Sequence, residues 1–369
     1  MFRIILALAF TFIISFTFQA GAYPELVRHG YVNCVSCHIS PSGGGILNDY
    51  GRSFSGEGLS TFARPGEESL FHGLIAREQL PKWLQIGGDI RGVQVHHENE
   101  DVRQGHFVVM QADAEVAVTV KGFTFDVAAG RFQMRSEEPR FKSRRFFLMY
   151  EFSEEWRIRV GRFLPAYGLH LADHVIATRR PLGFDHGQER YNIEGSWITD
   201  AMHVFVTASK GPSEQAEHEQ ESALTAQFAL AIRDSNKAGI NAWVGDSEKV
   251  QRQIVGAFAT LGFTPSLHLL AEADWQWSKS RNSDAHQTGF FAFSRLGYDL
   301  YQGVIIFGQS EFSQTNLSDN ATATERAGIG FQLFPRPHFD IQGIWTKQRF
   351  RAAGLGFEDY AWLSIHFYL

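Results

Sequence analysis

The sequence is poor in cysteine: Cys34 and Cys37 are the only two among its 369 residues. Two cysteines rule out a disulfide-rich secreted scaffold, which needs several bridges to stabilise a small core. They also argue against a structural zinc site, because no second cysteine pair exists at metal-ligand spacing. Whatever chemistry the cysteines serve is therefore concentrated in one place in the chain.

Long hydrophobic runs are missing as well, except at the N-terminus. Arg3 precedes a mostly apolar stretch over residues 4–18, and residues 20–22 form an A-x-A cleavage site. This is the pattern of a secretory signal peptide, so we expect residues 1–22 to be removed and the mature chain to begin at Tyr23. Beyond it no run of about twenty apolar residues occurs, which excludes transmembrane helices of ordinary length.

Strong charge of either sign is also missing. The formal net charge is −6, and no basic tract offers a surface for nucleic acid. In contrast, the chain is rich in glycine (35 residues) and in aromatics, with 33 Phe, 10 Tyr and 8 Trp. A secreted chain of this composition without hydrophobic helices has one membrane-spanning structure left, a closed β-barrel.

The two cysteines belong to a C-x-x-C-H run that extends from Cys34 to His38. This spacing suits a covalent c-type haem, because each thiol can form a thioether to one vinyl group and the adjacent imidazole becomes the proximal iron ligand. Two alternatives compete. A Cys34–Cys37 disulfide would leave His38 without a role, and a thioredoxin-like redox pair needs a βαβ context that the sequence does not show. We therefore predict one haem c, held by Cys34, Cys37 and His38.

Residues 23–81 form the predicted haem segment, and the sequence does not fix its second axial ligand. The segment contains no methionine, which excludes a local His/Met pair. Besides His38 it contains His29 and His72, and these are the candidates that we favour. Water is one alternative, and a residue of the later chain is another; the histidines concerned are His96, His97, His106 and His170.

From residue 82 to residue 369 the apolar positions recur with a period of two. In the run over residues 108–120, for example, apolar side chains alternate with mainly polar ones such as Asp113 and Glu115. Such alternation predicts strands with one apolar and one polar face. We count about sixteen strands and predict an all-β fold, an antiparallel transmembrane β-barrel whose carboxylates line a wet interior.

The connections between these strands tend to alternate in length. Short turns such as 121–122 and 264–265 follow the even strands, and longer polar loops follow most odd strands. Outer-membrane barrels have short periplasmic turns and longer external loops. An even strand number places both barrel ends on the short-turn side, so we expect the haem segment to enter from the periplasm.

The longest connection, residues 164–187, has the parity of the third external loop. As a loop it is expected to be solvated and at the surface; the alternative is a loop that folds inward and constricts the pore or meets the haem. One helical turn would place His170 and His174 on one face, which is only weak support for a metal site. The charged or titratable residues of this loop are His170, Asp173, His174, Arg179, Arg180, Asp185 and His186.

A signal peptide, one C-x-x-C-H segment and a barrel of about sixteen strands together resemble the fused monohaem cytochrome c–porins of bacterial outer membranes, whose best-known members are iron oxidases. The resemblance covers the whole architecture but few residues. Arg28 stands six residues before Cys34, as in that family. The Ser/Gly-rich run over residues 40–45 departs from the family, which often has aromatic or histidine residues there. The downstream family pattern is matched by Pro41, Asn48, Gly51, Arg52 and Phe54.

The resemblance implies an electron conduit. A covalent haem in or at the mouth of a porin-like barrel would pass electrons between an extracellular donor, such as ferrous iron, and a periplasmic electron carrier. The lumen carboxylates Asp89, Asp113 and Glu115 would attract cations, or they are the ordinary polar lining of a pore. The alternative function is a solute-transport porin whose N-terminal segment is a plug or an anchor. Both functions place the chain in outer-membrane lipid.

Overall fold

Sixteen strands form the wall of a closed barrel in the part of the chain that this computed structural model describes, residues 24–132, 140–171, 175–185, 187–212, 220–233, 235–354 and 356–369. Each strand is antiparallel to its neighbours in sequence, and β1 pairs with β16 to close the barrel. The predicted all-β barrel of about sixteen strands is confirmed. The strands are β1 (Leu84–Glu98), β2 (Arg103–Val120), β3 (Phe123–Phe132), β4 (Arg140–Glu151), β5 (Trp156–Phe163), β6 (Arg190–Ile198), β7 (Met202–Lys210), β8 (Ser222–Ile232), β9 (Asn236–Asp246), β10 (Val250–Gly262), β11 (Leu267–Ser280), β12 (His286–Tyr301), β13 (Val304–Gln314), β14 (Ala323–Arg336), β15 (Phe339–Phe350) and β16 (Glu358–Tyr368).

The two faces of the wall differ as the period of two predicts. In β6 the side chains of Asn192, Glu194 and Ser196 are buried inside the barrel, while Tyr191 and Ile193 are exposed on its outside. Successive residues of a strand point to opposite faces, so alternation in sequence becomes a polar interior and an apolar exterior. This is the arrangement of a barrel that meets lipid on the outside.

Aromatic side chains gather towards both ends of the wall. Near the short turns, Phe123 packs on Tyr150 with ring centroids 4.5 Å apart. Towards the opposite end, Trp275 packs on Phe290 at 5.3 Å. Aromatic rings prefer the two membrane–water interfaces, so the apolar band between these groups is the part of the wall suited to hydrocarbon.

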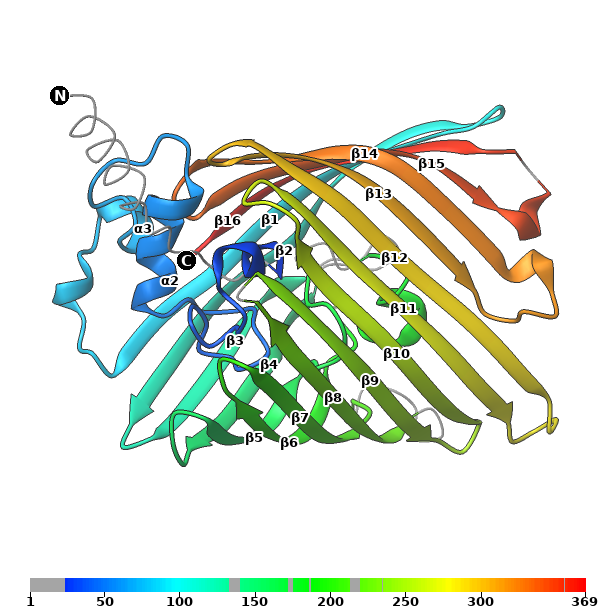
Figure 1. Cartoon of the computed structure of the whole chain (residues 1–369), viewed down its shortest axis with the longest axis horizontal. Coiled ribbons are helices and arrows are strands. Elements are labelled where there is room, and N and C mark those ends of the chain that lie inside the picture. Colours follow the sequence, from blue (N-terminus) through cyan, green and yellow to red (C-terminus); the bar gives the residue numbers. More distant parts are fainter. Residues whose placement is uncertain are drawn as a thin grey trace, which may run out of the picture.

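The two ends of the barrel also differ in their connections. Short turns such as 121–122 and 302–303 join the strands at one end, and longer loops such as 164–189 and 315–322 join them at the other. Figure 1 shows that the C-terminus lies at the same end as helices α2 and α3 of the N-terminal segment. The predicted alternation of turns and loops is confirmed.

The N-terminal segment closes the short-turn end of the barrel. Leu26, Phe54 and Leu59 of the segment pack against Ile305 and Phe334 of the wall. None of the described helices is long and apolar enough to cross a membrane. The predicted signal peptide lies outside the described residues. The helical turns are η1 (Pro24–His29), α2 (Asp49–Phe54), η2 (Ser55–Leu59), α3 (Leu70–Gly73) and η3 (Arg77–Gln79).

The connection between β5 and β6, which we call L3, folds into the barrel. Its apolar side chains Leu169, Leu171 and Ile176 pack on Phe258 and Leu270, which project inward from β10 and β11. A second cluster joins three further loop side chains to the inner wall: Tyr167, Leu182, Phe184, Trp243, Ile254 and Phe291. The interpretation of this connection as a solvated surface loop is therefore wrong, because burying these apolar side chains favours the inward position.

Candidate cofactor site in the barrel lumen

The C-x-x-C-H run forms a single helical turn. The amide of His38 donates to the carbonyl of Cys34 at 2.9 Å, and the amide of Cys37 donates to the same oxygen at 3.2 Å. Asn33 stabilises the start of the turn, because its Oδ1 accepts from the amide of Ser36 at 3.0 Å. The turn brings two thiols and one imidazole together within five residues.

Both cysteines are free thiols in the structure. Cys37 is buried, and Cys34 is partly accessible from a cavity inside the barrel. Burial raises the pKa of the Cys34 thiol, although the nearby ammonium of Lys237 opposes this shift. The carbonyl of Cys37 accepts from the amide of Asn48 at 2.8 Å, which ties the turn to the start of α2.

His38 lines a neighbouring cavity of about 190 Å³ inside the barrel. Its Nδ1 lies 3.4 Å from the carbonyl oxygen of Gly45. Metal-ligating imidazoles donate one ring nitrogen to such an acceptor, which fixes the ring and selects the other nitrogen for the metal. The carbonyl of Gly45 is an acceptor of this kind for Nδ1 of His38.

Gly43 and Gly44 line both cavities, and Gly45 lines the cavity of His38. All three have a positive φ, of 87°, 73° and 71°, a conformation that glycine adopts without strain. A side chain would be crowded at two of them: a Cβ on Gly43 would lie 3.1 Å from the sulfur of Cys34, and a Cβ on Gly44 would lie 3.1 Å from Nε2 of His170. The Ser/Gly-rich run is thus closely packed between the cysteine turn and L3.

Arginines of the barrel wall hold this loop. Arg159 of β5 donates to the hydroxyl groups of Ser40 at 2.9 Å and Ser42 at 2.8 Å, while its Nε bonds Glu194 at 2.7 Å. Four guanidinium groups border the cavity of His38; they belong to Arg91, Arg144, Arg145 and Arg159. Haem is a flat apolar macrocycle that carries two carboxylates. The apolar side chains of this lining would contact the macrocycle, and the guanidinium groups would pair with its carboxylates.

The lumen carboxylates identified in the sequence have partners. Glu115 pairs with Arg145, and Asp89 bonds Nε2 of His366 at 2.6 Å. Asp113 accepts from Gln111 at 2.7 Å. This pairing favours their interpretation as polar lining over their interpretation as an attractor of cations.

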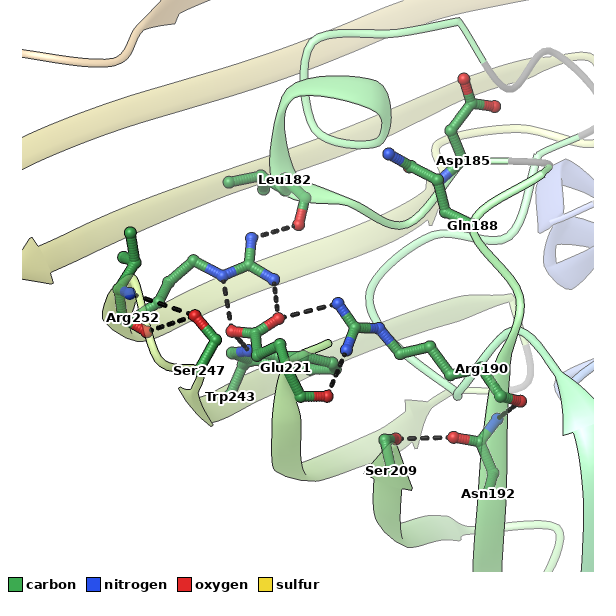
Figure 2. A network of polar contacts seen from close by, with 11 residues as sticks. Leu182, Asp185, Gln188, Arg190, Asn192, Ser209, Glu221, Trp243, Ser247 and Arg252 are labelled. Atoms are coloured by element: carbon green, nitrogen blue, oxygen red, sulfur yellow. Dashed lines mark hydrogen bonds and ion pairs between the residues drawn. The ribbon is translucent and has the colours of Figure 1, made fainter. Parts of the chain in front are cut away.

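L3 is fixed rigidly against the wall. Figure 2 shows Glu221 between Arg190 and Arg252, with Arg252 also directed at the carbonyl of Leu182 in L3. Glu221 accepts from Arg190 at 2.7 Å and from Arg252 at 2.8 Å. Two arginines on one carboxylate form a charge-assisted network that fixes the loop at this point.

Comparison with known proteins identifies the barrel but not the cysteine turn. No model of a known protein family matches the sequence, and no curated protein does. Among solved structures, OmpT of Vibrio cholerae is 8% identical with a TM-score of 0.60, covering 79% of this chain and 99% of that one. An anion-selective porin from Comamonas acidovorans is 10% identical with a TM-score of 0.59, covering 78% and 99%. The outer membrane channel DcaP of Acinetobacter baumannii is 12% identical with a TM-score of 0.57, covering 78% and 97%.

This chain has a porin fold. At these identities the likeness carries no information on what the chain binds or transfers. It concerns the barrel, whereas the predicted haem residues are in the N-terminal segment. The function has to be argued from the site inside the porin-like barrel.

The structure brings some of the predicted ligands together and separates others. His38 and His170 line one cavity in the lumen. His29 in η1 and the exposed His72 in α3 are not among the residues that line it. His174, which was predicted to share one helical face with His170, lies outside the described residues, as do Asp173 and His186. The alternatives His96, His97 and His106 lie near the long-loop end of the wall, on β1 and β2.

Sequence patterns alone do not reveal which residues shape the cavity around His38. Arg145, Arg159 and His366 occupy inward positions of strands that the period of two had placed correctly. Their parity was a signal that they face the lumen, but nothing in the sequence indicated which part of the N-terminal segment they would meet. Among the described residues, no group of three or more His, Cys, Asp or Glu side chains is arranged to hold a bare metal ion.

The residues at this site fit a covalent c-type haem. Two thiols and one imidazole share a turn, and Nδ1 of the imidazole faces a carbonyl acceptor. The adjoining cavity combines apolar side chains with four guanidinium groups and with three carboxylates, those of Asp89, Asp113 and Glu189. Haem binding by Cys34, Cys37 and His38 stays a prediction.

Proposed function

We propose that this chain is an outer-membrane electron conduit in which Cys34, Cys37 and His38 hold one haem c inside the lumen of a porin-like barrel. One observation carries the proposal: the C-x-x-C-H turn lies within the barrel, and its imidazole lines an internal cavity with Nδ1 at 3.4 Å from the carbonyl of Gly45. A plug would not need this donor set, whereas a c-type haem requires it.

The placement in the outer membrane rests on the barrel wall. Its outer face is apolar, aromatic rings gather towards both ends, and the solved structures it resembles are outer-membrane proteins. Short turns face the periplasm in such barrels. In this orientation the N-terminal segment enters from the periplasm, where a soluble electron carrier would meet it, and L3 extends from the external side towards the haem.

The protein residues supply position and electrostatics. Bound haem would supply a one-electron redox centre, whose potential depends on axial ligands, burial and nearby charge. His38 would hold the iron, and the glycine loop over residues 43–45 would allow close approach of the backbone. Arg145 and Arg159 offer positive charge to carboxylates at the cavity edge. Ferrous iron is one extracellular donor consistent with this site, although the paired lumen carboxylates give no support to cation attraction.

The proposal is tested by a pyridine haemochrome spectrum of the full mature chain purified from outer membranes in detergent, after extraction with acidified acetone. We expect the haem to stay with the polypeptide and to show a c-type band. The matched variants Cys34→Ala and Cys37→Ala should each leave only one thioether, and the double variant should retain no haem. A wild-type protein without covalent haem would overturn the proposal.

A solute-transport porin is the second candidate, and the four arginines around the cavity favour it. The four arginines outnumber the three carboxylates of the lining, Asp89, Asp113 and Glu189, which would suit anions, and one of the structural neighbours is named an anion-selective porin. This function predicts ion conductance in planar bilayers that does not change in Cys34→Ala. Absence of conductance from correctly folded wild-type protein would exclude it.

A further inference from the structure

Three histidines line the cavity beside the cysteine turn: His38, His170 and His366. His366 is already engaged, because its Nδ1 lies 2.8 Å from Asp340 and its Nε2 lies 2.6 Å from Asp89. An imidazole held between two carboxylates has no nitrogen left for a metal. Among the described residues this leaves His170 as the second histidine of the cavity that can act as a ligand.

His170 is in an unusual position for a loop residue. Its neighbours Leu169 and Leu171 are buried, whereas the imidazole of His170 is exposed to the interior of the barrel. It lines the cavity that contains His38 and also the cavity that contains Cys34. No hydrogen bond from its ring to any described residue occurs. The side chain thus faces the lumen, and no hydrogen bond to a described residue ties its ring to the fold.

The backbone that carries His170 is fixed. The amide of Leu169 donates to Glu272 at 2.9 Å, and Arg179 donates to the carbonyl oxygens of Tyr167 (2.7 Å) and Leu169. The preceding Gly168 donates to Asn241 at 3.0 Å and accepts from Gln227 at 3.1 Å. A ligand held on such a support has little freedom to lose when it binds, which is how metal sites are preorganised.

We propose that His170 is the distal axial ligand of the haem held by Cys34, Cys37 and His38, giving a bis-histidine site in which L3 supplies one ligand and the N-terminal segment the other. This inference rests on the proposed function. It replaces the candidates His29 and His72, neither of which lines the cavity.

Two histidine ligands would also determine which reaction the site serves. An iron with both axial positions filled has no site for oxygen or peroxide, so the site would serve electron transfer and not a peroxidase reaction.

The test uses the optical and electron paramagnetic resonance spectra of the purified full-length protein. We expect wild type to be six-coordinate and low-spin, and its ferrous form not to bind carbon monoxide at neutral pH. His170→Ala should keep the covalent haem but become high-spin and bind carbon monoxide, and added imidazole should restore the low-spin spectrum. His170→Met should stay six-coordinate with a higher reduction potential, because a thioether ligand favours ferrous iron.

The controls are His29→Ala, His72→Ala and His106→Ala, all of which should keep the wild-type spectrum. The inference is overturned if His170→Ala stays low-spin, or if His29→Ala or His72→Ala becomes high-spin instead. These outcomes leave the proposed function intact, because the haem is still bound. If wild type retains no covalent haem, the proposed function and the inference fail together. Since the ring of His170 bonds no described residue, we expect its substitution to leave the barrel folded.

Discussion

The barrel wall and the N-terminal segment, residues 24–83, are held in different ways. In the wall every strand is hydrogen-bonded along both edges, and closure through β1 and β16 leaves no edge unpaired. The segment has only short helical turns and reaches the wall through individual side chains. Arg28, for example, donates to the carbonyl of Pro265 at 3.0 Å, and Thr61 donates to that of Gln302 at 3.1 Å.

This difference determines how each region responds to damage. A strand that loses one contact is still aligned by its two neighbours. The segment relies on contacts between residues far apart in sequence: Ser42 and Arg159 are 117 positions apart, and Ser55 and His338 are 283 apart. We therefore expect single substitutions to release the segment while the barrel stays closed, except where one residue supports both regions.

Arg159 is such a residue, and its removal should have the largest effect. It pairs with Glu194 at 2.6 Å, with both side chains at most 2% exposed, and it also holds Ser40 and Ser42. Arg159→Ala leaves a buried carboxylate unpaired, which costs about 3–5 kcal/mol. We expect a lower urea midpoint of barrel unfolding, measured by tryptophan fluorescence in detergent, together with faster proteolysis of the segment.

The matched control for this variant is Arg349→Ala. Arg349 also pairs with a glutamate, Glu325, but the two side chains are 34% and 23% exposed. Surface pairs of this kind contribute roughly 1 kcal/mol or less. If Arg349→Ala and Arg159→Ala lowered the urea midpoint equally, the buried ion pair would contribute no more to stability than the exposed one.

Acid should have the next largest effect, through His338 in the turn between β14 and β15. His338 is fully buried, and its Nε2 donates to the carbonyl of Glu68 in the segment at 2.8 Å. Burial, opposed by this hydrogen bond and reinforced by Arg52 and His72, lowers the pKa of His338 to about 4. The docked segment therefore keeps the imidazole neutral, whereas release exposes it to water and restores a pKa near the usual 6.5.

Docking of the segment is strongest above pH 6.5 and weakens as the pH falls towards 4, because His338 binds a proton readily only when the segment is released. The free energy of docking should fall by on the order of 2–3 kcal/mol over this range. The measurement is cleavage of the segment relative to cleavage of loop 315–322 by the same protease across this range. His338→Gln should make the ratio less dependent on pH; an unchanged slope would exclude His338 as the cause.

The fold was predictable from the sequence because the environment of a strand residue is set by its parity. Alternation around Glu194 is enough to place it inside and Ile193 outside, without knowledge of any partner. The same local rule located the turns, since short connections recur after even strands. Prediction of the barrel therefore needed no long-range contact.

The site was only partly predictable, since its partners are far apart in the chain. The spacing of Cys34, Cys37 and His38 indicated the chemistry, but no local pattern places Arg159 or His170 beside them. The inward course of L3 does have a signal in the sequence. Apolar residues 169, 171 and 176 are poorly suited to a solvated loop, whereas the polar residues of the same stretch fit one.

Gly51 allows a smaller test of how the segment is built. An added Cβ there would lie 2.5 Å from the carbonyl oxygen of Cys37, which cannot move without shifting the cysteine turn. Gly51→Ala should destabilise the segment by about 1–3 kcal/mol, as overpacking does, and accelerate its proteolysis. The heat-modifiable migration of the barrel in gels should not change.

Gly195 of β6 provides the matched position in the wall. Nothing lies within 4 Å of a Cβ placed there, so Gly195→Ala should change stability by no more than about 0.5 kcal/mol. If the segment were cleaved as slowly in Gly51→Ala as in Gly195→Ala, the cysteine turn would tolerate displacement. That result would contradict the tight packing around Gly51.

The smallest effect is expected inside the segment, where the hydroxyl groups of Tyr31 and Tyr50 hydrogen-bond to each other. Tyr31→Phe or Tyr50→Phe should each cost about 0.5–1.5 kcal/mol, because the hydroxyl that is left loses its partner, and the double variant should cost less than the sum. Segment proteolysis at increasing urea concentration measures all three. A coupling energy near zero would mean that this hydrogen bond does not stabilise the segment; a measurable coupling means that the interior of the segment contributes to holding the cysteine turn in place.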